Sequence, residues 1–234
     1  MLNLRKTFAY YISSISLTTL SVLHASELQT FNVPIEDCQN FPGNWSLSPE
    51  EIFFALKYAT FIDTFQILEF GAGEGTVRLS KLLQKHGIPY EYHTFENSQS
   101  YLLNLPNVTF HLYALPPAPQ GNLAEWCPIV QSVEIPDLPI ADLVIVDGPH
   151  GVSRAEWYAK FKSLTRPGTI ILIDDFHHFS EFGEALDRNF VYETIIEYNR
   201  SHIYPIKNEG LEKIDGVANK CFKIVQVLEI KNEI

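Results

Sequence analysis

Short apolar runs alternate with amphipathic stretches along most of the chain. Five runs have the length and composition of buried strands: residues 66–70, 90–95, 108–115, 141–147 and 168–174. Apolar strands separated by helical patterns are typical of a parallel sheet that is covered by helices on both faces. The pattern therefore predicts an α/β fold with a doubly wound, mostly parallel sheet.

Helices are expected between these strands. The first should begin at Ser48, because "SPEE" supplies an N-cap serine, a proline at the first helical position and Glu51 at the third. Further helical stretches are residues 76–87, 98–105 and 153–165. The run 220–230 predicts a last strand, antiparallel and at the edge of the sheet, and the stretches 27–45 and 116–139 are expected to be irregular.

The N-terminal segment differs in composition from the rest of the chain. Residues 1–26 contain no acidic residue and carry Arg5 and Lys6 ahead of an uncharged stretch. This is similar to a signal peptide, and an ordinary N-terminal helix is the alternative interpretation. The stretch is short and rich in Ser and Thr, so a full membrane span is not expected. Residues 27–234 are expected to form a single domain.

Charge and cysteine content narrow the function classes. The net charge of −11 disfavours a nucleic-acid partner, because phosphate contacts need clustered Lys and Arg. Cys38, Cys127 and Cys221 are far apart and lack C-x-x-C spacing. This spacing disfavours a zinc site or a disulfide framework and favours buried thiols.

Three glycines lie within five residues directly after the first predicted strand, in "ILEFGAGEGT" (67–76). A strand, a glycine turn and a helix form an arrangement in which backbone N–H groups hold a ligand at the helix N-terminus. Gly71, Gly73 and Gly75 give G-x-G-x-G, whereas dinucleotide-binding proteins usually show G-x-G-x-x-G. An NAD-dependent oxidoreductase is therefore disfavoured. A tight crossover that binds no ligand is the structural alternative.

The stretch "LEFGAGEG" resembles the first motif of the class I S-adenosylmethionine (SAM)-dependent methyltransferases, an apolar strand and an acid followed by G-x-G-x-G. The resemblance covers about residues 53–230 and implies the Rossmann-like methyltransferase fold. It further implies that the three glycines lie against the methionine part of the cofactor and that Glu69 helps to hold its amino group, directly or through water. Glu96, which ends the second strand, would bind both ribose hydroxyls. "YALPP" (113–117) has no acid after the third strand, so no adenine contact is assigned.

Two further strands end in acidic residues, in "VIVDGPHG" (144–151) and "IILIDDF" (170–176). This pair resembles the metal-dependent O-methyltransferases of the catechol type. The resemblance implies that Asp147, Asp174 and Asp175 bind a hard cation such as Mg²⁺. In the alternative, Asp147 caps the next helix and Asp175 is solvated, and there is no metal site.

His150 lies three residues after Asp147, where catechol-type enzymes have a lysine that deprotonates the acceptor. A histidine can act as this base near neutral pH. The alternative is a loop histidine that caps the following helix. His177 and His178 also follow the fifth strand, and at least one of them is expected to be a loop residue.

These expectations combine into a SAM-dependent methyltransferase that O-methylates a small hydroxylated molecule with a divalent cation. A non-catalytic SAM-binding accessory protein and a methyltransferase without metal are the alternatives. The acidic charge and the absence of an N-P-P-Y-type motif after the fourth strand disfavour RNA or protein methylation. Free SAM is expected in the cytoplasm, which is the expected compartment despite the signal-like residues 1–26. Membrane contact is expected only if that segment is retained as an anchor.

Overall fold

The computed structural model describes residues 28–39, 47–117, 123–199, 202–205 and 221–231. The signal-like segment 1–26 lies outside this part of the chain, and its two interpretations stay open. Within the described residues, no helix combines the length and the apolar composition needed to cross a bilayer.

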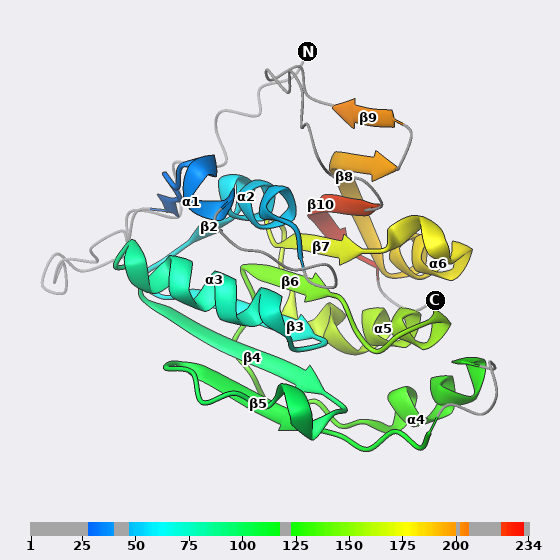
Figure 1. Cartoon of the computed structure of the whole chain (residues 1–234). Helices are drawn as coiled ribbons and strands as arrows, with labels where there is room; N and C mark the ends of the chain where they lie inside the picture. The colour runs from blue at the N-terminus through cyan, green and yellow to red at the C-terminus, as the bar shows by residue number, and fades with distance from the viewer. Residues whose placement is uncertain (1–27, 40–46, 118–122, 200–201, 206–220, 232–234) are drawn as a thin grey trace, which may run out of the picture.

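A central sheet of eight strands organises the fold (Figure 1), in the order β5-β4-β3-β6-β7-β10-β8-β9. The strands are β3 (Phe65–Phe70), β4 (Tyr90–Glu96), β5 (Val108–Leu112), β6 (Leu143–Val146), β7 (Ile170–Asp174), β8 (Phe190–Asn199), β9 (His202–Pro205) and β10 (Phe222–Ile230). The five strands from β5 to β7 are parallel. This confirms the predicted mostly parallel α/β sheet, and each of the five predicted parallel strands is present.

Helices cover both faces of this sheet (Figure 1). On one face, α2 (Pro49–Tyr58) and α3 (Glu74–Lys85) pack onto a core that includes Ile52, Phe54 and Leu82. On the other face, α4 (Cys127–Ser132), α5 (Trp157–Phe161) and α6 (Ser180–Asn189) contribute to a second core. The short α1 (Ile35–Gln39) and the two-stranded sheet of β1 (Gln29–Thr30) and β2 (Thr60–Phe61) lie outside the main sheet.

The start of α2 follows the predicted capping chemistry. The Ser48 hydroxyl accepts a hydrogen bond from the backbone N–H of Glu51 at 3.2 Å, and the Glu51 carboxylate accepts from the Ser48 N–H at 2.5 Å. Two other helices differ from expectation. The stretch 98–105 contains only a 3₁₀ turn, Gln99–Tyr101, and residues 153–165 combine 3₁₀ turns with the short α5.

The last part of the chain extends the sheet further than expected. β10 is antiparallel to β7, as predicted, but it lies between β7 and β8 and not at the edge. β8 pairs along the second side of β10, and β9, antiparallel to β8, takes the edge position. Because β8 was not anticipated, the sequence pattern left β10 without a second neighbour.

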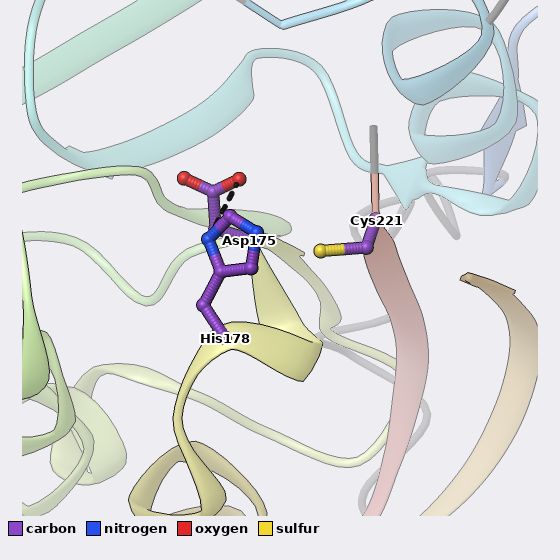
Figure 2. Close-up of side chains that lie close together, drawn as sticks. All are labelled: Asp175, His178 and Cys221. Atoms are coloured by element: carbon purple, nitrogen blue, oxygen red, sulfur yellow. Dashed lines mark ion pairs between the residues drawn. The ribbon is translucent and has the colours of Figure 1, made fainter. Parts of the chain in front are cut away.

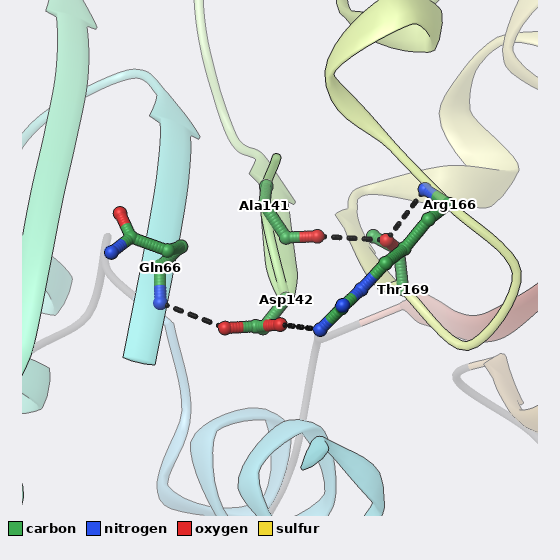
Figure 3. A network of polar contacts seen from close by, with 5 residues as sticks. All are labelled: Gln66, Ala141, Asp142, Arg166 and Thr169. Atoms are coloured by element: carbon green, nitrogen blue, oxygen red, sulfur yellow. Dashed lines mark hydrogen bonds and ion pairs between the residues drawn. The ribbon is translucent and has the colours of Figure 1, made fainter. Parts of the chain in front are cut away.

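A polar network fixes the amino ends of the central strands (Figure 3). The buried carboxylate of Asp142 accepts hydrogen bonds from the Gln66 N–H at 3.0 Å and from Arg166 Nη2 at 2.5 Å. The Thr169 hydroxyl donates to the Ala141 carbonyl at 2.7 Å and accepts from the Arg166 N–H at 3.0 Å. These contacts satisfy the buried polar groups at this end of the sheet and leave the opposite, carboxyl end for function.

Candidate active site

The glycine turn lies at the carboxyl end of β3 and touches the end of β6. Gly71 has φ +100°, and a Cβ atom there would lie 2.5 Å from the backbone nitrogen of Gly148. Only glycine allows both this backbone conformation and this close approach. The Gly71 N–H also donates to the Phe95 carbonyl of β4 at 2.8 Å. Gly71 therefore holds three strand ends together at the candidate site.

Gly73 and Gly75 have different surroundings. Among the residues that the structure describes, and apart from its chain neighbours, a Cβ atom at Gly73 would meet no atom within 4 Å, so the backbone faces open space there. A Cβ atom at Gly75 would lie 3.0 Å from the Leu47 side chain. The role of Gly75 is thus packing against the segment before α2, while Gly73 leaves room for a ligand at the start of α3.

Glu69 is buried at the end of β3, 1% exposed, directly below this turn. Its carboxylate accepts a hydrogen bond from the Thr76 hydroxyl at 2.7 Å, and that hydroxyl also accepts from the Gly73 N–H at 3.0 Å. Burial raises the pKa of Glu69 to about 7, against the opposing effect of the Thr76 hydrogen bond. A cationic group placed next to this carboxylate would favour its ionised form and lower its pKa again.

Glu96, at the end of β4, lies beside the turn. Its Oε2 accepts from the Ala72 N–H at 2.8 Å, and its Oε1 accepts from Asn97 N–H at 2.8 Å and Ser98 N–H at 2.7 Å. Burial raises the pKa of Glu96, and these backbone N–H groups act against that rise. A carboxylate accepts about four hydrogen bonds, so an acceptor position is left on Oε2. Bidentate binding of a ribose diol stays a prediction, and the observed contacts suit a single hydroxyl better.

The end of β6 brings Asp147 and His150 to the same edge of the sheet. Asp147 is partly buried, and its backbone N–H donates to the Phe70 carbonyl of β3 at 2.8 Å. His150 is exposed in the loop that leads to the 3₁₀ turn Val152–Glu156, whose N-cap residue is Gly151. The predicted base is thus accessible to a substrate on the carboxyl side of the sheet.

Arg154 is a buried cation between the ends of β6 and β7 that the sequence analysis did not single out. Its Nε donates to the Pro149 carbonyl at 3.2 Å and its Nη1 to the Asp174 carbonyl at 2.9 Å. The same Nη1 lies 3.8 Å from Asp175 Oδ2, in an ion pair whose arginine side chain is 4% exposed. In the sequence, Arg154 is an isolated arginine three residues after "DGPHG" (147–151). This position does not reveal that the side chain is buried.

The three predicted Mg²⁺ ligands are close in the topology but are not gathered into one ligand set. Asp174 is buried at the end of β7, and Asp175 follows it with φ +56°. The two carboxylate oxygens of Asp175 face Arg154 at 3.8 Å and His178 Nδ1 at 3.4 Å. In the part of the chain that the structure describes, the one group of three ligand atoms within 4.8 Å consists of Asp175, His178 and Cys221. Binding of Mg²⁺ by Asp147, Asp174 and Asp175 therefore stays a prediction of the sequence.

The sequence matches one model of a known protein family. A family model described as a methyltransferase domain matches residues 68–176, a little under half of the chain. This range begins in β3 and ends just after β7, so it contains every predicted site residue. No curated protein matches the sequence.

Several solved methyltransferase structures are similar in shape. They include an O-methyltransferase from Thermotoga maritima (12% identity, 89% of this chain and 80% of that chain covered, TM-score 0.49). A precorrin-6y C5,15-methyltransferase from Geobacter metallireducens (14%, 84% and 99%, TM-score 0.47) and an rRNA methylase from Streptococcus thermophilus (14%, 77% and 95%, TM-score 0.44) are also similar. Similarity at this level does not transfer an acceptor to this chain. Together, the sheet order, the glycine turn and the family match support a class I SAM-dependent methyltransferase.

Proposed function

We propose that the protein transfers a methyl group from SAM to a hydroxyl oxygen of a small molecule. The observation that carries this proposal is the open backbone at Gly73 beside the buried Glu69 carboxylate. This pair suits the methionine part of the cofactor, with its ammonium group on Glu69. The acceptor would lie over the ends of β6 and β7, where ligands bind in doubly wound folds.

In the proposed reaction, the acceptor oxygen attacks the methyl carbon in line with the departing sulfur. The C–O bond forms as the C–S bond breaks, and the sulfonium becomes the neutral thioether of S-adenosylhomocysteine (SAH). The hydroxyl proton passes to the exposed imidazole of His150. Orientation of the two substrates supplies much of the remaining rate.

The proposed reaction does not depend on Mg²⁺. Binding of Mg²⁺ by Asp147, Asp174 and Asp175 stays a prediction of the sequence. Arg154 already places a positive charge 3.8 Å from Asp175, so the repulsion among these carboxylates does not require a cation. A methyltransferase without Mg²⁺ is therefore the form of the proposal that the contacts favour.

The cell compartment and the partners belong to the same proposal. We expect a cytoplasmic enzyme, because SAM is available there, and a small-molecule acceptor with no nucleic-acid partner. The net charge of −11 supports the last point. A non-catalytic SAM-binding protein is the competing function, and turnover is the property that separates the two.

Replacing His150 tests the proposed chemistry. Methyl transfer from labelled SAM to catechol-like and other hydroxylated compounds should occur in EDTA, and His150→Gln should lower kcat by about 100-fold or more. SAH affinity, measured by calorimetry, should not change. His86→Gln is the control, because His86 pairs with Asp37 at the C-terminus of α3, outside the site. Unchanged kcat in His150→Gln would remove His150 from the reaction, and no transfer to any acceptor would favour the accessory protein.

The raised pKa of Glu69 predicts a pH-dependent affinity for SAH. Binding of the ammonium group favours the ionised carboxylate, which is depleted as the pH falls below its pKa of about 7. SAH affinity should therefore fall by roughly tenfold between pH 7 and pH 5.5. In Glu69→Gln, the affinity should be low and independent of pH over this range. A wild-type affinity that does not vary with pH would show that Glu69 does not hold the ammonium group.

A further inference from the structure

Three side chains of metal-ligating type lie together at the carboxyl end of β7 (Figure 2). Asp175, His178 and Cys221 each offer one ligand atom, and these atoms lie within 4.8 Å of one another. Asp175 and His178 come from the segment after β7, and Cys221 directly precedes β10. The group combines an oxygen, a nitrogen and a sulfur donor, unlike the three carboxylates that the sequence predicts for Mg²⁺.

Sheet pairing explains why these residues meet. In the antiparallel pair of β7 and β10, Asp174 lies opposite Phe222, so the next residues outward, Asp175 and Cys221, leave the sheet side by side. The 3₁₀ turn Phe176–His178 then brings His178 Nδ1 to 3.4 Å from Asp175 Oδ1. Asp175 has φ +56°, a conformation that aspartate tolerates better than most residues. Backbone geometry therefore brings these three residues to the same place.

The charged groups around the cluster are arranged so that one oxygen of Asp175 faces it. Arg154 lies on the other oxygen, Oδ2, at 3.8 Å. Two further basic side chains, Lys223 and His177, contact Glu197 at 3.0 Å and 3.3 Å. In protein metal sites, the second oxygen of a carboxylate ligand is usually held by a neighbouring group that does not itself bind the metal.

We propose that Asp175, His178 and Cys221 form a binding site for Zn²⁺. Carboxylate, imidazole and thiolate are its common ligands, and three protein ligands leave a fourth tetrahedral position for water or another small ligand. The observed Oδ1–Nδ1 distance of 3.4 Å equals the separation of about 3.4 Å expected for oxygen and nitrogen ligands of tetrahedral zinc. A Zn–S bond of about 2.3 Å places the sulfur about 3.6 Å from the other two ligands, so a small side-chain rotation completes the site.

Accessibility also suits a metal site. Cys221 is 2% exposed, which protects its thiol, whereas the side chains of Asp175 and His178 are 28% and 37% exposed and leave a path to solvent. The sequence disfavoured a zinc site, because the three cysteines are far apart and lack C-x-x-C spacing. Here the ligands come from two strand ends, which linear spacing does not reveal. The zinc site takes no part in the proposed methyl transfer. It uses Asp175, which the sequence predicts as a Mg²⁺ ligand, so Asp175 cannot serve both metal sites.

Metal content gives a direct test that does not depend on activity. The reduced full-length protein is stripped of metal with EDTA, incubated with Zn²⁺ and then freed of unbound ion. Elemental analysis by inductively coupled plasma mass spectrometry should then find one zinc per chain. Cys221→Ser should weaken zinc binding by at least about 100-fold. This loss is larger than the roughly 10–100-fold that is typical when a residue beside a ligand, and not the ligand itself, is replaced. Replacement of zinc by Co²⁺ should give a thiolate-to-cobalt charge-transfer absorption that Cys221→Ser removes.

Matched variants control for general effects of thiol and imidazole loss. Cys127→Ser and His177→Gln change residues of the same types outside the cluster and should retain zinc and the cobalt absorption. His178→Gln should lose zinc, and it replaces Cys221→Ser as the main test if that variant does not fold by circular dichroism. A protein that stays zinc-free in excess Zn²⁺ would overturn the proposal. So would equal zinc retention and cobalt absorption in Cys221→Ser and the wild type.

Discussion

Replacing Gly73 by valine should reduce SAH affinity by at least 100-fold, about 2.7 kcal/mol, while the protein stays folded. In the described part of the chain, apart from the neighbouring residues, a Cβ atom at this position meets no atom within 4 Å, and the backbone φ of 175° is extended and does not require glycine. The added side chain would therefore enter only the space assigned to the cofactor. As the N-cap of α3, Gly73 contributes no side-chain hydrogen bond that could be lost.

Gly71 is the matched comparison within the same turn. A Cβ atom there would lie 2.5 Å from Gly148 N, and its φ of +100° strains any other residue. Gly71→Ala should thus lower the free energy of unfolding by about 2–4 kcal/mol. Gly73→Val should leave the melting temperature nearly unchanged. If calorimetry shows wild-type SAH affinity for Gly73→Val, the cofactor does not lie on this turn.

The second large effect is expected at Arg154. Arg154→Met removes a buried charge that bridges the Pro149 and Asp174 carbonyls and faces Asp175, and it leaves those acceptors without their donor. Loss of one partner from a buried ionic network costs about 3–5 kcal/mol. For a chain of 234 residues, the melting temperature should fall by roughly 6–20 °C.

Arg188→Met is the control for Arg154→Met, because Arg188 is exposed at the end of α6. It should change the melting temperature by no more than about 1–2 °C, as expected for a surface substitution. Thermal unfolding followed by circular dichroism measures both variants. A melting temperature of Arg154→Met within 2 °C of the wild type would show that the two strand ends do not depend on this guanidinium.

The core of the fold could be predicted because its signals are local. Buried parallel strands such as Ile170–Asp174 are apolar up to their last residue, and the capping box at Ser48 is four residues long. The region after residue 180 was harder to predict. β8 mixes polar residues, including Glu193 and Glu197, with apolar ones, and its place beside β10 depends on pairing between distant segments.

The residues of the candidate site also differ in how far the sequence could predict them. Glu69 and the glycines could be assigned because a short motif contains them all. The roles of Arg154 and Cys221 could not, because they follow from the packing of the β6 loop and from the register of β10 on β7. One contact of the Glu96 carboxylate is also long-range: Ala72 lies 24 residues before it. Sequence patterns identify such residues by type, but not by partner.

A crystal structure of the protein grown with SAH is the direct test of cofactor binding at the glycine turn. We expect density for SAH at the carboxyl end of β3, with its amino group on Glu69, its methionine part over Gly73 and a ribose hydroxyl on Glu96 Oε2. Density for SAH at another place on the molecule, with the turn at Gly71–Gly75 unliganded, would show that this turn is not the cofactor site.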